Sequence, residues 1–138
     1  LPRHVAIYSD LFQSCALGTD PALGLRRANY LRKKLAGDRF VPNRVLYHTM
    51  IKAFGRCGDL ETALELVDEM EGHRHLVDRE TMGHLLQGCV SNRESGFRHA
   101  LLVWRRIRKR KIWMDVKLYN LMLRAGKECG LGSPGHTR

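Results

Sequence analysis

The residues of this sequence with the clearest chemical potential are basic, and they gather in two runs. RRIRKRK, residues 105–111, has six Lys or Arg in seven positions, and RRANYLRKK, residues 26–34, has five in nine. The whole chain has 24 Lys and Arg against 14 Asp and Glu, a formal net charge of +10. Positive charge at this density favours a polyanionic partner such as nucleic acid. The alternative for each run is a solvated helix face. The candidates for phosphate contact are Arg105, Arg106, Arg108 and Lys109.

Patterns that indicate metal binding or catalysis are weak by comparison. The four cysteines form no C-x-x-C pair, and the closest histidine pair, His73 and His75, lies in a turn with no cysteine at ligand spacing. The carboxylates of residues 59–69 are spaced as a helix cap and a solvated face. No apolar run approaches the roughly 18 residues of a membrane span. We therefore expect no cofactor, no metal, no catalytic site and no membrane partner in this chain.

The elements that must position the basic residues follow an internal repeat. RVLYHTMIKAFGRCG, residues 44–58, has apolar residues at the spacings of an amphipathic helix and closes on small residues. Similar segments begin near residues 4, 80 and 116. The equivalent positions are 39, 35 and 37 residues apart, and they are occupied by Tyr8, Tyr47, Met82 and Tyr119. A period in this range is typical of a helical solenoid, in which neighbouring units stack to bury one continuous core.

A second helix is expected after each of the first three segments, within LRRANYLRKKL, ETALELVDEM and FRHALLVWRRI. Asp59 is a suitable N-cap for one of these helices, and Asp78 and Asp115 are suitable for the third and fourth first helices. We predict an all-α fold, a right-handed α-solenoid of three helix pairs plus one trailing helix. The repeats would span about 5–43, 44–78, 79–115 and 116–138, the last one partial, within a fragment of a longer protein.

The second unit is specific enough to indicate a family. VLYHTMIKAFGRCGDLETALELVDEMEGHRHLVD, residues 45–78, resembles the pentatricopeptide repeat. It has a tyrosine followed by a polar residue, a small-residue close, Gly-Asp-Leu-Glu before the second helix and a terminal aspartate. The resemblance covers nearly the whole chain, more loosely in the first and third units. TMGHLLQGC, SGFRHALLVWR and ECGLG are similar to segments of animal mitochondrial members of the family.

The resemblance implies an RNA-binding superhelix whose first helices line a concave groove, with one base read per repeat. In the family's scheme, the residue after the tyrosine position and the last residue of the unit meet the base, and the residue two before the tyrosine flanks it. The implied base-reading residues are Ser9 with Asn43, His48 with Asp78, Asp115 in the third unit and Asn120 in the last; the implied flanking residues are Ala6 and Val45.

Two units depart from the family's pattern. His48 can stack or hydrogen-bond, but Gly83 has no side chain to read a base, and Glu80 brings a carboxylate where an apolar flank is expected. The alternative for Ser9, His48 and Asn120 is that they are ordinary polar residues of a first helical turn. The degraded pattern favours recognition of folded RNA shape and phosphates over a readable single strand.

We expect a noncatalytic RNA-binding module of the mitochondrial matrix that acts on tRNA or rRNA during processing or stabilisation. The alternative is a protein-interaction scaffold within a mitochondrial ribosome or an RNA-processing complex. In that case the basic second helices would meet an acidic protein or RNA at the outer surface. Base reading would depend on the groove residues, whereas outer docking would depend on the basic run of residues 105–109.

Overall fold

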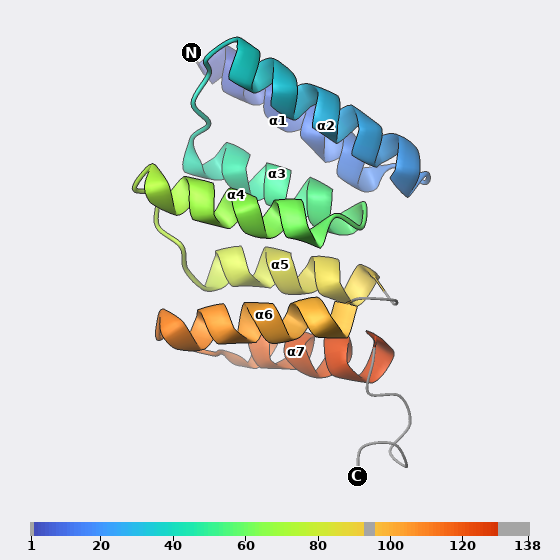
Figure 1. The fold of residues 1–138 in the computed structure, drawn as a ribbon, viewed down its shortest axis with the longest axis vertical. Coiled ribbons are helices and arrows are strands. Elements are labelled where there is room, and N and C mark those ends of the chain that lie inside the picture. Colours follow the sequence, from blue (N-terminus) through green and yellow to red (C-terminus); the bar gives the residue numbers. More distant parts are fainter. Residues whose placement is uncertain (1, 93–95, 130–138) are drawn as a thin grey trace.

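The computed structural model describes residues 2–92 and 96–129, and within these ranges it is built from helices without a strand (Figure 1). The helices are α1 (Pro2–Leu17), α2 (Pro21–Gly37), α3 (Arg44–Arg56), α4 (Leu60–Gly72), α5 (Arg79–Ser91), α6 (Gly96–Lys109) and α7 (Val116–Cys129). The predicted α-solenoid of three helix pairs and a trailing helix is confirmed. None of the helices in the described ranges is long and apolar enough to cross a membrane.

The helix pairs stack along the long axis of the molecule, with α1 and α7 at opposite ends (Figure 1). The first helices α1, α3, α5 and α7 form one row, in which α3 packs against α1 and α5, and α5 packs against α3 and α7. Each second helix packs on the first helix of its own pair and on the next first helix. Equivalent positions of neighbouring units therefore meet along the row of first helices.

In the two internal units, the tyrosine position of the repeat belongs to the core. Tyr47 is fully buried, and its hydroxyl donates a hydrogen bond to Glu69 at 2.8 Å. Met82 occupies the same position in the next unit and is also fully buried. Tyr119 lies on the last helix of the stack and is 55% exposed. Because a fully buried large side chain contributes roughly 1.5–3 kcal/mol, this position stabilises each internal unit substantially.

The small residues that close each first helix allow the backbones to approach. Gly55 of α3 faces Gly88 of α5, and a Cβ atom added to Gly88 would lie 2.8 Å from the Gly55 Cα atom. The same added atom would lie 3.0 Å from the Leu60 side chain. Cys15, Cys57 and Cys89 occur near the same ends and are buried free thiols, as expected for packing residues. The side chain of Cys129 lies outside the described part of the chain.

The three turns that follow the second helices share one geometry. Arg39, Arg74 and Lys111 have positive φ angles of 55°, 67° and 54°, and each lies four residues before the end of its unit. The next amide donates back into the preceding helix in every case, for example from Phe40 to the Leu35 carbonyl at 3.0 Å. This is the Schellman arrangement, with a basic residue where glycine is usual. The shared turn delivers each unit's last residue to the same place.

That last residue caps the next first helix. Asn43 Oδ1 accepts from the Leu46 amide at 2.9 Å, and Asp115 Oδ1 accepts from the Leu118 amide at 2.8 Å. Asp78 forms a capping box with Thr81. Asp59, at the start of α4, accepts from the Thr62 amide at 3.1 Å. An N-cap of this kind is worth about 1 kcal/mol. The predicted capping roles of Asp59, Asp78 and Asp115 agree with these contacts.

The approach of α3 to α5 predicts opposite effects for two alanine substitutions in α5. We expect Gly88→Ala to destabilise the chain by about 1–3 kcal/mol, because the added methyl group overpacks the helix contact. Gly83→Ala is the matched control, since an added Cβ there meets nothing within 4 Å. It should stabilise the chain by up to about 1 kcal/mol through helix propensity. Urea unfolding followed by circular dichroism measures both, and equal stabilities would contradict the close approach.

Candidate nucleic-acid interface

The sequence-predicted base-reading residues meet where successive units join. We call these places the first junction (α1, α3 and the turn at 38–43), the second junction (α3, α5 and the turn at 73–78) and the third junction (α5, α7 and the turn at 110–115). Each junction combines the N-terminal half of a first helix with the turn that caps the next one. Equivalent residues can therefore be compared across the three.

The first junction is an open groove that holds a complete predicted set. Ala6, Ser9, Asn43 and Val45 line a cavity of about 590 Å³ together with Phe40, Val41 and two further residues of α1. Val45 is 62% exposed, and the Ser9 hydroxyl lies 3.4 Å from the Thr49 hydroxyl. Asn43 uses its carbonyl oxygen as a helix cap, so its amide NH₂ group is left to donate. A hydroxyl, an amide and an apolar flank thus face one space.

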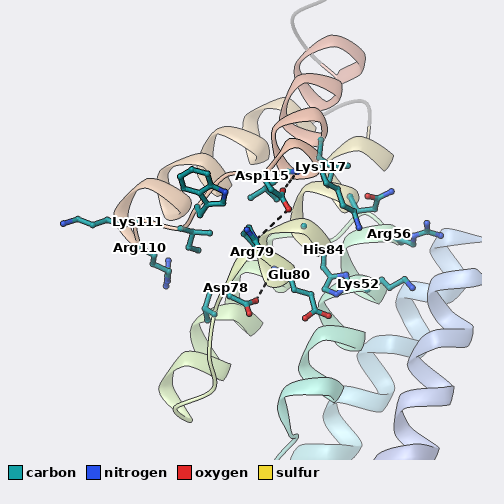
Figure 2. Close-up of a pocket in the computed structure, with 17 residues that line it drawn as sticks. Lys52, Arg56, Asp78, Arg79, Glu80, His84, Arg110, Lys111, Asp115 and Lys117 are labelled. Carbon is teal, nitrogen blue, oxygen red and sulfur yellow. Dashed lines mark hydrogen bonds and ion pairs between the residues drawn. The ribbon is translucent and has the colours of Figure 1, made fainter.

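The third junction is a larger and more basic groove of about 980 Å³ (Figure 2). Its wall includes the predicted positions Gly83 and Asp115, and Glu80 at the flanking position. Arg79 lies 3.8 Å from the Asp115 carboxylate. The cationic side chains along the groove outnumber the carboxylates of Asp78, Glu80 and Asp115; they are Lys52, Arg56, Arg79, Arg110, Lys111 and Lys117. Because Gly83 has no side chain, it leaves the groove open.

Trp113 is a groove residue that the sequence prediction missed. It lines the third junction and is 74% exposed, and it occupies the turn position that Val41 holds at the first junction. An exposed indole face can stack on a nucleobase. In the sequence, the available signal for Trp113 was its position two residues before the end of its unit. It could not be recognised without the structure, because the family's scheme assigns no role to that position.

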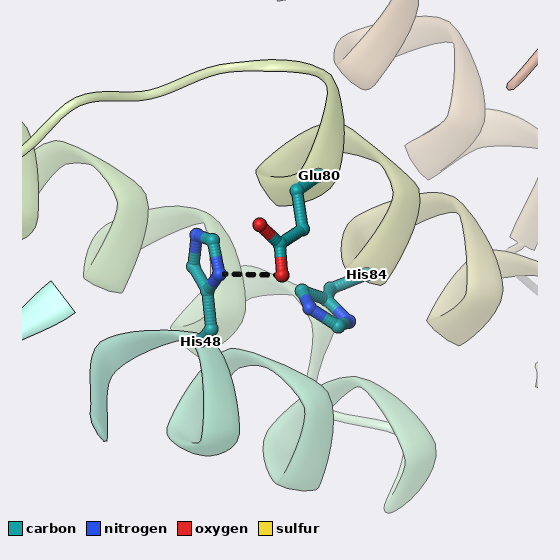
Figure 3. A group of neighbouring side chains, drawn as sticks. All are labelled: His48, Glu80 and His84. Atoms are coloured by element: carbon teal, nitrogen blue, oxygen red, sulfur yellow. Dashed lines mark ion pairs between the residues drawn. The ribbon is translucent and has the colours of Figure 1, made fainter. Parts of the chain in front are cut away.

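The second and third junctions adjoin at two histidines, one from α3 and one from α5. His84 on α5 lies beside His48 on α3, with ring centroids 5.1 Å apart, and Glu80 reaches the same place (Figure 3). Burial lowers the pKa of His84 to about 4, with a smaller contribution from His48. Burial also lowers the pKa of His48, assisted by the nearby Arg44 guanidinium. Both imidazoles are therefore neutral at pH 7.

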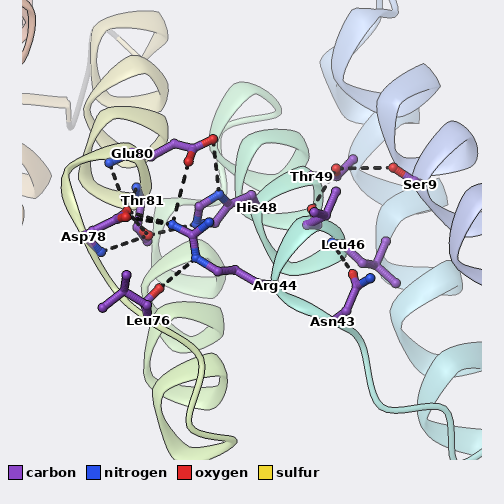
Figure 4. A network of polar contacts seen from close by, with 11 residues as sticks. Ser9, Asn43, Arg44, Leu46, His48, Thr49, Leu76, Asp78, Glu80 and Thr81 are labelled. Carbon is purple, nitrogen blue, oxygen red and sulfur yellow. Dashed lines mark hydrogen bonds and ion pairs between the residues drawn. The ribbon is translucent and has the colours of Figure 1, made fainter.

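The second junction is closed by a network of polar contacts (Figure 4). Arg44 Nη2 donates to both carboxylate oxygens of Asp78 at 2.9 Å, and Arg44 Nε donates to the Leu76 carbonyl at 3.1 Å. His48 is only 6% exposed, and its Nε2 lies 2.8 Å from the Thr81 hydroxyl oxygen. Both predicted base-reading residues of this unit, His48 and Asp78, are already bound within the protein.

The difference between the junctions follows from one position. Arg44 lies three residues before Tyr47, and the residue at that position in the first unit is Val5, which cannot form an ion pair. Arg79 occupies the position in the third unit, but its contact to Asp115 is longer, at 3.8 Å. Asn120, the predicted residue of the last unit, is exposed on α7. The structure thus places Ser9 and Asn43 in one open groove. His48 and Asp78 are instead held in contacts with Thr81 and Arg44.

Part of the basic run forms ion pairs within the outer row of helices, which comprises the second helices α2, α4 and α6. Arg106 Nη1 lies 2.6 Å from Asp68 Oδ1, and Arg110 Nη2 lies 2.6 Å from Glu71 Oε1. The hydrogen bond from Arg110 lowers the pKa of Glu71. Arg32 of α2 lies within 3.6 Å of Glu65 and Glu69 from the other side. The outer helices are therefore joined through the acidic face of α4. Three residues of the predicted phosphate-binding set stay exposed: Arg105, Arg108 and Lys109.

Comparisons with known proteins agree with the repeat pattern. The family model described as the PPR repeat matches residues 38–71. The chain is 37% identical over 129 residues to pentatricopeptide repeat-containing protein 1, mitochondrial, of Rattus norvegicus, and 36% identical over the same length to the Homo sapiens and Mus musculus proteins of that name. These alignments cover 94% of this chain and 18–19% of the relatives. The chain thus spans about a fifth of the length of the relatives it matches.

The closed second junction predicts a measurable coupling between Arg44 and Asp78. The two side chains are 31% and 38% exposed, so solvent screens their ion pair in part. We expect a double-mutant cycle with Arg44→Met and Asp78→Asn to give a coupling of about 1 kcal/mol. Asparagine retains the N-cap, so the cycle isolates the ion pair from capping. Urea unfolding measures the cycle, and additive effects of the two substitutions would contradict the lock.

Proposed function

We propose that this pentatricopeptide repeat chain is a noncatalytic RNA-binding module that acts in the mitochondrial matrix on tRNA or rRNA. The relatives it matches are named as mitochondrial proteins, and the repeat family is generally RNA-related. The observation that carries the proposal is the open groove of the first junction. There the implied base-reading pair, Ser9 and Asn43, lies with its implied flanking residues Ala6 and Val45 around one cavity.

The chemistry of the first junction suits a nucleobase. A serine hydroxyl donates and accepts, and the free NH₂ group of Asn43 donates, which matches a base edge that presents both kinds of group. Val45 and Val41 are about 60% exposed and supply apolar surface for the face of the base. Such a surface is costly to leave in water, so a stacked base would cover it.

The third junction suits a nucleotide in a different way. Trp113 offers an exposed ring for stacking, while Lys52, Lys111 and Lys117 surround the groove with positive charge for phosphates. Gly83 contributes space rather than a hydrogen bond. We propose that this junction holds a base and its phosphate by stacking and charge, with little discrimination among bases.

The closed second junction bears on the class of RNA. A single strand read by successive repeats would need three neighbouring open sites, whereas here Arg44 occupies the middle one. Two contact sites separated by a closed one favour a folded RNA that touches the row of first helices at two points. This supports tRNA or rRNA as the substrate class over an extended single strand.

Ion pairs also support a noncatalytic role for the acidic helix α4. Asp68 and Glu71 are engaged by Arg106 and Arg110, and Glu69 accepts from the buried Tyr47 hydroxyl. These carboxylates brace the solenoid. The second candidate function, a protein-interaction scaffold, draws its support from the exposed basic residues Arg105, Arg108 and Lys109 on the outer row, which could meet an acidic protein surface.

We expect groove substitutions to weaken RNA binding without changing its salt dependence. Ser9→Ala/Asn43→Ser removes the base-facing hydroxyl and amide, while serine retains an N-cap on α3. The loss of two hydrogen bonds should reduce affinity by about tenfold. Trp113→Ala should reduce it by about fivefold to a hundredfold through lost stacking. Titration against tRNA and a single-stranded RNA measures both effects. Ser14→Ala, in α1 but bonded only to its own helix at the Asp10 carbonyl, is the control.

The outer basic run predicts a different signature. Arg105→Gln/Arg108→Gln/Lys109→Gln spares Arg106 and its pair with Asp68, so the fold should be unaffected. If these residues contact phosphates, the slope of log affinity against log salt should fall by up to about 3, since each lost phosphate contact contributes about 0.7–0.9. If this variant weakens RNA binding and the groove variants do not, the contact lies on the outer surface, and the scaffold function is favoured. Absence of RNA binding by the wild type would overturn the RNA-binding proposal for this chain.

A further inference from the structure

Three potential metal ligands converge between α3 and α5. His48 of α3 and Glu80 and His84 of α5 each offer one ligand atom, and these atoms all lie within 4.8 Å of one another (Figure 3). His48 and His84 are 36 positions apart in the sequence, so the cluster arises only when the two units stack. Glu80 and His84 are four residues apart on one helix, a spacing that places both on one face.

The donor set matches a first-row divalent ion. Two imidazoles and one carboxylate form a known zinc-binding combination, in which a fourth position stays open to water or another ligand. Ligand atoms around a tetrahedral zinc ion lie about 3.4 Å apart, as Zn–N and Zn–O distances of 2.0–2.2 Å require. The ligand atoms must therefore approach one another by up to about 1.4 Å. The Glu80 side chain is exposed and contacts Arg44 and His48 only at 3.7 Å, so it can move toward the two imidazoles.

The surroundings of His48 fix its ring in a ligating orientation. Its Nε2 atom lies 2.8 Å from the Thr81 hydroxyl oxygen, while its Nδ1 atom faces Glu80 at 3.7 Å. Thr81 is itself held by the capping box with Asp78. In the tautomer that donates from Nε2 to the Thr81 hydroxyl, Nδ1 presents its lone pair toward Glu80, which is the usual arrangement of metal-bound imidazole.

We propose that His48, Glu80 and His84 bind a Zn²⁺-like divalent transition-metal ion that links the second and third units. The ion bridges α3 and α5 near the N-terminal ends of these helices, whereas Gly55 and Gly88 hold the same helices together nearer their C-terminal ends. Glu80 and His84 also line the third junction, so the open coordination position faces the groove. The site stands apart from the proposed RNA-binding function, because it needs no RNA to form.

Titration of the chelator-treated 138-residue chain with Co²⁺ and Zn²⁺ tests the site. We expect one Co²⁺ ion to bind with the visible absorption of a four-coordinate nitrogen and oxygen site and without a thiolate charge-transfer band, and Zn²⁺ to displace it. Zn²⁺ should also raise the melting temperature of the wild type. Glu80→Gln and His84→Gln should each lower affinity at least tenfold while the helical circular dichroism spectrum is retained.

His73→Gln/His75→Gln is the matched control, since it removes two histidines in the turn after α4 that lie outside the cluster. This variant should bind Co²⁺ as the wild type does. The proposal is overturned if the wild type binds no ion, if the Co²⁺ spectrum is that of a thiolate site, if Glu80→Gln and His84→Gln bind as tightly as the wild type, or if the control loses equal affinity. A folded His84→Gln variant keeps the test decisive even where substitution of buried His48 impairs folding.

Discussion

The close packing of neighbouring first helices is the constraint on which the rest of this structure depends. No single helix pair is large enough to bury its own apolar face, so α3 must lie between α1 and α5. Gly55 and Gly88 set how near α3 and α5 can come, because a side chain at Gly88 would collide with the facing backbone. That separation fixes whether side chains from adjacent units reach each other. The open grooves, the Arg44–Asp78 pair and the histidine cluster all follow from it.

Residues at the unit ends serve the fold before they can serve a ligand. Asn43, Asp78 and Asp115 each cap the helix that follows, and each is delivered there by a turn of the same geometry. A cap uses one oxygen and leaves the remaining polar atoms available. In Asn43 the amide NH₂ group is left, whereas in Asp78 the guanidinium of Arg44 donates to both carboxylate oxygens, including the capping one. The same position is thus suited to recognition in one unit and to bracing in the next.

The charge of the chain is divided in a similar way. A net charge of +10 favours polyanions, but Arg32, Arg106 and Arg110 are held against the acidic face of α4. Their role is to join the outer helices, which approach one another less closely than the first helices do. The charge that is left for a partner includes the exposed Arg26, Arg27, Lys33 and Lys34 of α2, the exposed end of α6 and the lysines around the third junction. These basic residues lie both on the second helices and around the groove of the third junction.

The sequence by itself determined the repeat period, the helical class and the helix caps, because these depend on local spacing and on short-range hydrogen bonds. The resemblance to the pentatricopeptide repeat also implied that Ser9 and Asn43 belong to one site. Only the tertiary structure decided which junctions are open. The Arg44–Asp78 pair, the exposed Trp113 and the His48–His84 contact depend on side-chain directions across stacked units. Those directions are set by the distance between helices, which a pattern along one chain does not encode.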